Sequence, residues 1–546
     1  MAERRVRGKS ASPGLAIGAL VVVDQDRELE ERRQGLPEEE QTALEAAIAK
    51  AMSDLEALAD VASGDGADIL AFQIEMLSDP ALVEDVLPLI DGGQDAASAW
   101  KTGLDQQLAI YKSADDDYFK ARASDLEDLQ DRVLRVLRGA SVDLPDIPAG
   151  AILVAHDLPP SRFLSIDAKK LGGLVLTEGN ASSHVAILVR ARGLPMIVDL
   201  EAAIETGVDA ADTTTEGILD ANEGHVLIDP APETRKRYEA RRRQSIKAAR
   251  EAAASRDRPA VTADGQTVSV LVNIDDPAAV DDALLAASDG VGLLRTEFLL
   301  IGRQDLPGED EHFQTYVDLQ RRLAGKQLII RTLDIGGDKP LPGLELPKEG
   351  NPFLGLRGIR LCLDHPDLFK PQVRALLRAA AKGPLQVMLP MVAVQAEIEE
   401  TRRLFDDCLE ELRREGVAAA MPDIGVMVET PAAAIAADQL DAAHFSIGSN
   451  DLIQYTMAAA RDGTGRVAAL QDPQHPAIER LIKMVVDHGA ATGKDVSVCG
   501  NMASEPACLP LLLRVGMRKI SVLPGMFDQV KATIATIDLG AEADRP

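Results

Sequence analysis

The carboxy-terminal half of the chain repeats one pattern eight times, and this repetition limits the possible folds more than any other feature. Short apolar segments of strand type alternate there with segments of helical periodicity. The eight strand candidates are Val268–Ile274, Gly290–Arg295, Leu328–Asp334, Leu385–Val392, Ile424–Thr430, Phe445–Asp451, Val496–Asn501 and Ile520–Gly525. Eight such units within about 280 residues are what a (β/α)8 barrel requires, so we expect one over residues 259–546.

Polar residues stand at or just after the ends of several of these strands, where barrel enzymes carry their chemistry. They are Arg295, Glu297, Arg331, Asp334, Glu429, Asn450, Asp451 and Cys499, with Arg461 shortly after the sixth strand. Arginines bind phosphate and carboxylate groups bidentately, and Glu429 and Asp451 are hard oxygen ligands suited to Mg²⁺. A thiol in such surroundings is able to donate a proton, although a lone cysteine is more often a small buried apolar residue. The pattern predicts a site for a small multi-anionic ligand.

A separate stretch, "TEGNASSHVAILVRARGLPMIV" (Thr177–Val198), places a histidine directly after two serines. Ser182 or Ser183 is a good helix N-cap, and the residues after His184 show helical spacing until Gly193. Free N–H groups at a helix start bind anions, and the helix dipole favours a neutral, nucleophilic imidazole. Taken alone, however, the stretch fits a histidine that merely begins a helix at least as well.

The rest of the chain divides by composition and periodicity. Residues 28–138 predict a bundle of about four helices, and short strands alternate with helices in residues 139–230, which carry His184. Residues 1–27 add a loop and a strand to this α/β part. Residues 231–258 are charged on nearly every turn, which indicates a solvent-exposed linker helix.

The formal net charge of −30 over 546 residues argues against nucleic acid or an anionic membrane surface as a partner. No window reaches the roughly 20 apolar residues of a membrane span, and the first residues lack the apolar segment of a signal peptide. The four cysteines show neither metal-ligand spacing nor a disulfide framework. We therefore expect a cytoplasmic protein.

Eight motifs, taken in order, resemble those of one family. They are "GKSASPGLAIG", "SSHVAILVRARGLPMIV", "GVGLLRTEFL", "RTLDIGGDKPLP", "NPFLGLRGIR", "GVMVETPAAA", "FSIGSNDLIQYTMA" and "VCGNMA". Together they extend over essentially the whole chain. The sequence is similar to the Enzyme I family, the phosphoenolpyruvate–protein phosphotransferases of the bacterial phosphotransferase system.

This resemblance implies a multidomain α/β fold: a swivelling α/β phosphohistidine domain with an inserted helical bundle, followed by the barrel. It implies that His184 is the phosphorylated nucleophile and that Cys499 protonates the enolate of pyruvate. The residues implied to bind phosphoenolpyruvate are Arg295, Arg331, Asn450, Asp451 and Arg461, with Arg357 also near the site. Glu429 and Asp451 are implied ligands of Mg²⁺. The implied partners are an HPr-type histidine phosphocarrier protein, which docks on residues 28–138, and a second copy of the chain.

Two other functions stay open at this point. Phosphoenolpyruvate synthases and pyruvate phosphate dikinases share the histidine and barrel motifs, but they carry a large nucleotide-binding domain. A catalytically weak regulatory phosphoacceptor is the other alternative, since Asn180 and Asn501 depart from the family pattern. The motifs also leave open whether the carrier serves sugar transport or a nitrogen-regulatory branch.

Overall fold

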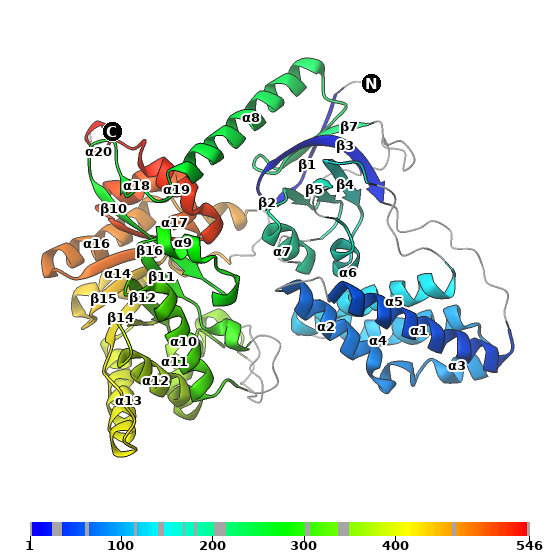
Figure 1. Cartoon of the computed structure of the whole chain (residues 1–546), viewed down its shortest axis with the longest axis horizontal. Coiled ribbons are helices and arrows are strands. Elements are labelled where there is room, and N and C mark those ends of the chain that lie inside the picture. The colour runs from blue at the N-terminus through cyan, green and yellow to red at the C-terminus, as the bar shows by residue number, and fades with distance from the viewer. Residues whose placement is uncertain are drawn as a thin grey trace. The chain divides into compact units, whose positions relative to one another are not determined.

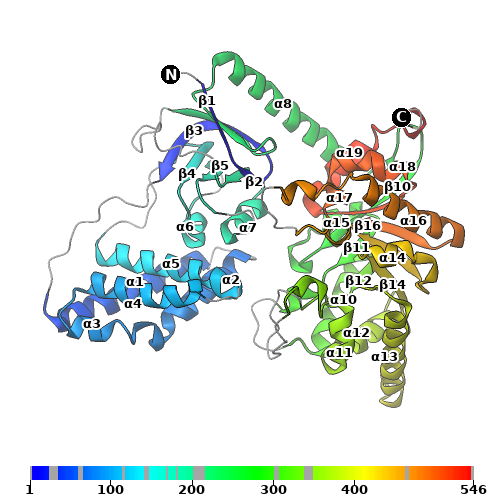
Figure 2. The same cartoon turned by 180° about the vertical axis from the view of Figure 1, so that it is seen from behind.

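The computed structural model describes residues 3–23, 35–59, 65–113, 117–139, 147–167, 170–179, 183–200, 215–300, 306–336, 349–460 and 466–542. The chain forms two compact units, Met1–Ile246 and Lys247–Pro546 (Figures 1 and 2). The first unit contains a helical bundle and a mixed β-sheet, and the second contains a barrel.

The helical bundle is formed by α1 (Pro37–Ala59), α2 (Asp65–Ser78), α4 (Ala96–Ser113) and α5 (Asp117–Leu137), with the short η1 (Pro80–Val83) and α3 (Leu87–Asp91). Helix α1 begins with a proline and three glutamates, which suit the free N–H groups and dipole of a helix start. It buries Leu44, Ala47, Ala51 and Leu55, one face at helical spacing. Trp100 of α4 is fully buried in the bundle and donates from Nε1 to the carbonyl of Gln130 at 3.2 Å.

The sheet of the first unit has eight strands in the order β1-β8-β7-β3-β4-β5-β6-β2. Their bounds are β1 (Arg4–Arg7), β2 (Lys9–Ser12), β3 (Leu15–Val23), β4 (Ala151–Ala155), β5 (Leu171–Leu176), β6 (Met196–Val198), β7 (Glu216–Asp220) and β8 (His225–Ile228). Strands β3 to β6 are parallel neighbours, and α6 (Pro160–Leu164) and α7 (His184–Ala191) lie between them in sequence. The bundle enters the chain between β3 and β4, which confirms the expected inserted arrangement.

Helix α8 (Pro232–Ala254) connects the two units. In its first half, the hydroxyl of Tyr238 lies 3.0 Å from Nε2 of His225, and Arg241 forms an ion pair of 2.6 Å with Asp220. Beyond its end, Arg256 pairs with Asp528 of the second unit at 2.6 Å. Each end of the linker is thus attached to the unit that it enters.

The second unit is a closed barrel, as the repeated pattern predicted. Its parallel strands are β10 (Thr267–Ile274), β11 (Gly290–Leu294), β12 (Gln327–Arg331), β13 (Gln386–Leu389), β14 (Asp423–Val428), β15 (His444–Gly448), β16 (Asp495–Cys499) and β17 (Lys519–Val522). Each strand pairs with the next, and β10 pairs with both β17 and β11, so the sheet closes. The short β9 (Ala260–Val261) adds to β10 in the antiparallel sense.

Helices surround this barrel (Figures 1 and 2). They are α9 (Asp282–Ala287), α10 (Glu309–Leu323), α11 (Ile359–Asp364), α12 (Pro366–Ala380), α13 (Gln395–Arg414), α14 (Pro431–Ile435), α15 (Ser449–Met457), α16 (Pro476–Thr492), α17 (Asn501–Ser504), α18 (Leu509–Arg514), α19 (Phe527–Ile534) and α20 (Leu539–Glu542). Most strands end before the bounds expected from sequence. The sixth, for example, ends at Gly448, and α15 begins at the next residue, so Asp451 lies in the first turn of a helix.

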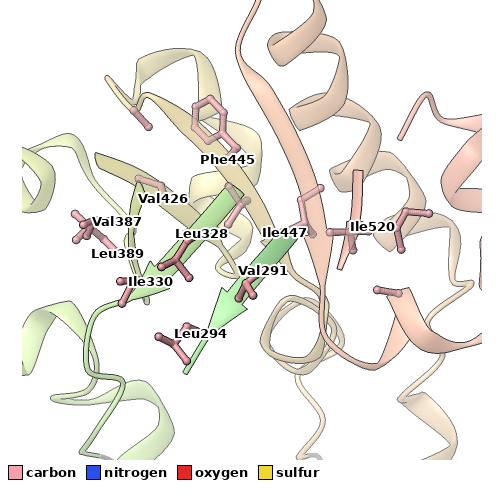
Figure 3. Packing of buried hydrophobic residues seen from close by; sticks show 14 of the residues in the cluster. Val291, Leu294, Leu328, Ile330, Val387, Leu389, Val426, Phe445, Ile447 and Ile520 are labelled. Carbon is pink, nitrogen blue, oxygen red and sulfur yellow. The ribbon is translucent and has the colours of Figure 1, made fainter. Parts of the chain in front are cut away.

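Alternate residues of the strands build two separate apolar groups. One includes Val291, Leu328 and Ile330 (Figure 3), and its cluster also contains buried residues of the surrounding helices. The other contains strand residues alone, among them Met388 and Cys499, and so fills the barrel interior. This interior group lies inside the barrel, next to the carboxyl ends of the strands.

Among the described residues, no helix combines the length and the apolar character that crossing a membrane requires.

Candidate active site

A cavity of about 280 Å³ lies at the carboxyl ends of the barrel strands. Its lining residues are Asp275, Leu293, Arg295, Glu297, Phe298, Arg331, Asp334, Arg357, Met427, Glu429, Gly448, Asn450, Asp451, Cys499 and Gly500. The structure therefore brings together six of the seven site residues expected in the barrel. The seventh, Arg461, lies outside the described residues.

Arg331 ends strand β12, and its guanidinium is almost fully buried between two carboxylates. Its Nη2 lies 3.1 Å from Glu297, and its Nη1 lies 3.0 Å from Asp334. Burial alone would lower the pKa of Arg331, but Glu297, Asp334 and Glu429 more than offset this and raise it. The side chain is therefore a fixed cation at the cavity wall.

A second buried arginine, Arg357, joins two strand ends that are far apart in sequence. It donates from Nε and Nη2 to both oxygens of Asp334, at 3.0 and 2.9 Å. It also contacts both carboxylate oxygens of Asp451, at 3.2 and 3.3 Å, and the Tyr455 hydroxyl at 3.3 Å. The planar guanidinium suits such bidentate contacts, and its Nη2 contacts both Asp334 and Asp451.

Glu429 follows strand β14 and has only 1% of its surface exposed. Its Oε1 accepts a hydrogen bond from the backbone N–H of Met391 at 2.5 Å. Burial, reinforced by the charges of Asp451 and Asp334, raises the pKa of Glu429 to about 8. The neighbouring strand approaches closely here, because a Cβ at Gly448 would lie 2.9 Å from Oε2 of Glu429.

Cys499 ends strand β16 and is buried beside the cavity. Its Sγ accepts from the Ser446 hydroxyl at 3.5 Å and donates to the Ile447 carbonyl at 3.6 Å. Burial raises the pKa of Cys499 above its usual value, so the sulfur keeps its proton near neutral pH. Such a thiol is suited to donate a proton rather than to attack as a thiolate.

The loop after Cys499 makes close contact with the side chain of Asn450. The side-chain oxygen of Asn450 accepts a hydrogen bond from the backbone N–H of Asn501 at 2.9 Å. Gly500, which directly precedes Asn501, has φ +93°, and a Cβ on Gly500 would lie 3.0 Å from the side-chain oxygen of Asn450. Only glycine satisfies both the backbone angle and the close approach. The Asn450 amide group is thereby held at the cavity edge.

Arg295 is more accessible than the other two arginines. One third of its side chain is exposed, and Nη1 lies 2.8 Å from Asp275. A partly exposed pair of this kind exchanges partners at small free-energy cost. Arg295 is therefore available to bind an incoming anion.

The donor set of the cavity fits a hard divalent cation. Glu429 and Asp451 are both buried and line the same cavity, and their mutual repulsion contributes to the raised pKa of Glu429. Among the described residues, no group of three or more histidine, cysteine, aspartate or glutamate side chains forms a complete metal site. Two carboxylates are enough for Mg²⁺, which commonly completes its shell with water and substrate oxygens.

The predicted nucleophile lies in the first unit. His184 is the first residue of α7, and Ser183 is the N-cap, whose hydroxyl accepts from the Ala186 N–H at 3.3 Å. This confirms a helix start at the histidine, and it identifies which of the two serines caps it. Strand β5 leads into this segment, and β6 follows the helix, as the sequence indicated.

Sequence reasoning did not assign roles to several residues that shape the cavity. Glu297 bridges Arg331 and the backbone N–H of Asp334, which it binds at 2.7 Å. Tyr455 donates to the Phe353 carbonyl at 2.6 Å and contacts Arg357. The charge of Glu297 was visible at a strand end, but no sequence signal identified Tyr455, which occupies an ordinary helix position.

Comparisons with known proteins agree with this architecture. Three models of phosphoenolpyruvate-utilising enzymes match the chain: the N-terminal domain over residues 7–122, the mobile domain over 147–224 and the phosphoenolpyruvate-binding domain over 249–539. A phosphoenolpyruvate-protein phosphotransferase of Geobacillus stearothermophilus is 40% identical over 540 residues, which cover 95% of this chain and 91% of the relative. One of Haloferax volcanii is 38% identical over 561 residues, covering 100% of this chain and 96% of the relative.

Among solved structures, an NMR solution structure of Enzyme I has 24% sequence identity and a TM-score of 0.35, covering 44% of this chain and 99% of that chain. The full-length relatives confirm the resemblance seen in the motifs. With its ordered domains and its polar barrel cavity, the chain belongs to the family of phosphoenolpyruvate–protein phosphotransferases.

Proposed function

We propose that the protein transfers the phosphoryl group of phosphoenolpyruvate to His184 and then to a histidine of a small HPr-type carrier protein, releasing pyruvate. The observation that carries this proposal is the barrel cavity. It combines arginines, two buried carboxylates and a protonated thiol in a chain whose full-length relatives bear that enzyme's name.

The substrate carries a phosphate and a carboxylate, and the cavity offers matching cations. In this proposal Arg295 and Arg331 bind these groups, and Arg461 joins them. Asn450 and the backbone beside Asp451 add neutral hydrogen bonds. Arg357 adds a further cation when its contacts with Asp334 and Asp451 loosen.

Mg²⁺ is the proposed cofactor, with Glu429 and Asp451 as its protein ligands. When bound, the ion would offset the negative charge of the substrate oxygens. Glu429 is held by the Met391 N–H, and Asp451 is paired with Arg357 until that contact loosens.

The chemistry consists of two linked steps. A ring nitrogen of His184 attacks phosphorus, so that a P–N bond forms as the bond from phosphorus to the enol oxygen breaks. The electron pair stays on that oxygen, which gives the enolate of pyruvate. Cys499 then donates its thiol proton to the enolate carbon, and pyruvate leaves. Positioning and fixed charges dominate the first step.

The division of labour along the chain belongs to the same proposal. Residues 1–27 and 139–230 carry the phosphohistidine, residues 28–138 dock the carrier, residues 231–258 link the units, and residues 259–546 bind phosphoenolpyruvate. The active form is a homodimer through the barrel in the cytoplasm. Light scattering tests the dimer: a monomer at micromolar concentration with the full turnover rate would contradict it.

The proposal is tested by supplying phosphoenolpyruvate and Mg²⁺ and locating the phosphate by intact mass and peptide mapping. One acid-labile, base-stable phosphate on His184 is expected, and none in the His184→Ala variant. Phosphate on a serine, or on the His184→Ala variant, would contradict the proposal.

Steady-state pyruvate release with a carrier separates the enzyme from its two rivals. A regulatory phosphoacceptor would be phosphorylated once and release little further pyruvate. A phosphoenolpyruvate synthase or pyruvate phosphate dikinase would need a nucleotide. Sustained pyruvate release that depends on the carrier, and not on a nucleotide, is the expected result.

A further inference from the structure

A fully buried glutamine lies behind the cavity without lining it. Gln372 is on the inner face of α12, among the buried apolar residues Phe369, Val373 and Leu376. An amide in such surroundings costs free energy unless its polar atoms are hydrogen-bonded. Its position therefore calls for defined partners.

The amide of Gln372 has three partners, each from a different segment of the barrel. Its Oε1 accepts from the backbone N–H of Leu333 at 3.0 Å. Its Nε2 donates to the Thr296 hydroxyl at 3.1 Å and to the Tyr316 hydroxyl at 3.2 Å. The Thr296 hydroxyl in turn donates to the carbonyl of Arg331 at 3.1 Å. One side chain thus connects the segments that follow β11 and β12.

Residues 295–297 and 331–334 in these two parts of the chain include four of the residues that line the cavity. Thr296 lies between Arg295 and Glu297, while Leu333 lies between Arg331 and Asp334. The amide thus links Thr296, next to Arg295 and Glu297, to Leu333, next to Asp334.

The orientation of the amide is determined by its partners. The backbone N–H of Leu333 is only a donor, so the oxygen of Gln372 must face it. The Thr296 proton goes to the Arg331 carbonyl, so that hydroxyl needs a donor, which Nε2 supplies. The Tyr316 hydroxyl also accepts from Nε2, and its oxygen lies 3.0 Å from Nδ1 of His312. A carboxylate or an apolar side chain cannot satisfy this set.

We propose that Gln372 is a positioning residue for the phosphoenolpyruvate step. It fixes the position of residues 295–297 relative to residues 331–334. This inference rests on the proposed function. Gln372 touches no substrate in it and acts through Arg295 and Arg331 alone.

The test begins with Gln372→Met in the full chain, because methionine has a similar size and makes none of the three hydrogen bonds. Misplacement by about 1 Å can cost about 10²-fold in rate. We therefore expect kcat/KM for phosphoenolpyruvate to fall about 10²-fold. Phosphate exchange between His184 and a phosphorylated carrier should stay unchanged. An unchanged kcat/KM, even with a lower melting temperature, would overturn the proposal.

Gln320→Met is the matched control. Gln320 of α10 donates to the carbonyls of Ala379 and Gly383 at 3.2 and 2.9 Å, ahead of β13 and away from the cavity lining. Its replacement removes two partly buried hydrogen bonds from the same barrel. We expect a lower melting temperature with a nearly normal kcat/KM. Equal losses of kcat/KM in the two methionine variants would reduce Gln372 to a stabilising role and overturn the inference.

The Gln372→Glu variant allows a measurement, the pH dependence of KM, that a change in stability alone would not alter. A buried carboxyl stays protonated at low pH, where its carbonyl oxygen and its one O–H replace two of the three hydrogen bonds of the amide. The KM of this variant should approach the wild-type value at low pH and rise as the carboxyl ionises. The KM of the wild-type protein should not show this rise. A profile parallel to the wild type would overturn the proposal. A wild-type protein that does not use phosphoenolpyruvate would instead remove the proposed function and the inference together.

Discussion

At the scale of single residues, the cavity is a balanced set of buried charges. Arg331 and Arg357 share Asp334 between them, and Asp451 completes the contacts of Arg357. Removing one member of such a set leaves an uncompensated buried charge, which costs more than the pair contributes. The neutral groups of the site, Cys499 and Asn450, can be altered without that cost, so they give cleaner tests of chemistry.

Cys499→Ala should separate the two half-reactions. Pyruvate formation should fall by about 10²–10⁴-fold, the usual contribution of positioned proton transfer, because the enolate loses its proposed proton donor. Phosphate exchange between His184 and the carrier should persist, since that step forms no enolate. Both rates are measured on one preparation.

Cys499→Ser serves as the control for shape. It restores most of the side-chain volume but offers a hydroxyl instead of a thiol as the acid. If Cys499→Ala impaired carrier exchange as strongly as pyruvate formation, the thiol would be structural and another group would donate the proton.

Another residue-scale prediction concerns pH. His444 begins strand β15, is 2% exposed, and neither ring nitrogen has a hydrogen-bond partner among the described residues. Burial lowers its pKa from 6.5 to about 4. The unfolded chain takes up a proton near pH 6.5 while the folded chain does not, so this contribution to stability is lost as the pH falls from about 6.5 to 4.

Between pH 7.5 and 5, the loss should be about 2 kcal/mol, given 1.36 kcal/mol per pKa unit. Urea unfolding of the barrel at both pH values measures it. The His444→Phe variant, which cannot titrate, should lose about 2 kcal/mol less than the wild type over the same range. Equal losses in the two proteins would show that His444 is not the group responsible.

At the scale of elements, the sequence was informative where a pattern is local and repeated. All eight barrel strands could be predicted, because apolar runs separated by helical periodicity need no knowledge of distant partners. Their ends could not, because a strand ends where its neighbour stops pairing and where side chains such as Glu429 take over backbone N–H groups. Gln372 was invisible for a related reason: one polar residue in a helical pattern looks like a surface position until its contacts are known.

The start of α7 offers an element-scale test. Ser183→Ala removes the N-cap and should destabilise the helix start by about 1 kcal/mol, visible as faster hydrogen exchange at Ala186. Ser183→Asp should keep the cap, because its carboxylate also accepts from the backbone and suits the helix dipole. Its negative charge, however, stands next to His184, which receives an anionic phosphoryl group in the proposed mechanism.

The two variants should therefore affect hydrogen exchange and the rate of phosphorylation differently. Hydrogen exchange should be faster in Ser183→Ala and normal in Ser183→Asp. The rate of His184 phosphorylation should fall further in Ser183→Asp than in Ser183→Ala. A rate of phosphorylation in Ser183→Asp equal to the wild type would contradict a phosphoryl transfer at this helix start.

At the scale of the whole molecule, chemistry is divided between two units joined by one helix. Every residue that lines the cavity, from Asp275 to Gly500, belongs to the second unit, while His184 and the helical bundle belong to the first. The side-chain contacts of α8 and of the residues after it follow the same division. Tyr238 and Arg241 bind the first unit, and Arg256, beyond the helix, binds Asp528 of the second. Among the described residues, each apolar cluster contains residues of one unit alone.

This division predicts the behaviour of the separated units. A fragment of residues 1–246 should fold and exchange phosphate between His184 and a phosphorylated carrier, but it should take none from phosphoenolpyruvate. A fragment of residues 247–546 should bind phosphoenolpyruvate with Mg²⁺, measured by calorimetry, yet release no pyruvate, because it has no acceptor for the phosphoryl group. The full chain should perform both reactions, since α8 joins the two units covalently and gives the acceptor a high effective concentration. Pyruvate release by the barrel fragment alone would mean that the acceptor lies within it and that His184 is not the nucleophile. Loss of carrier exchange in a folded first fragment would mean that the docking surface requires the barrel.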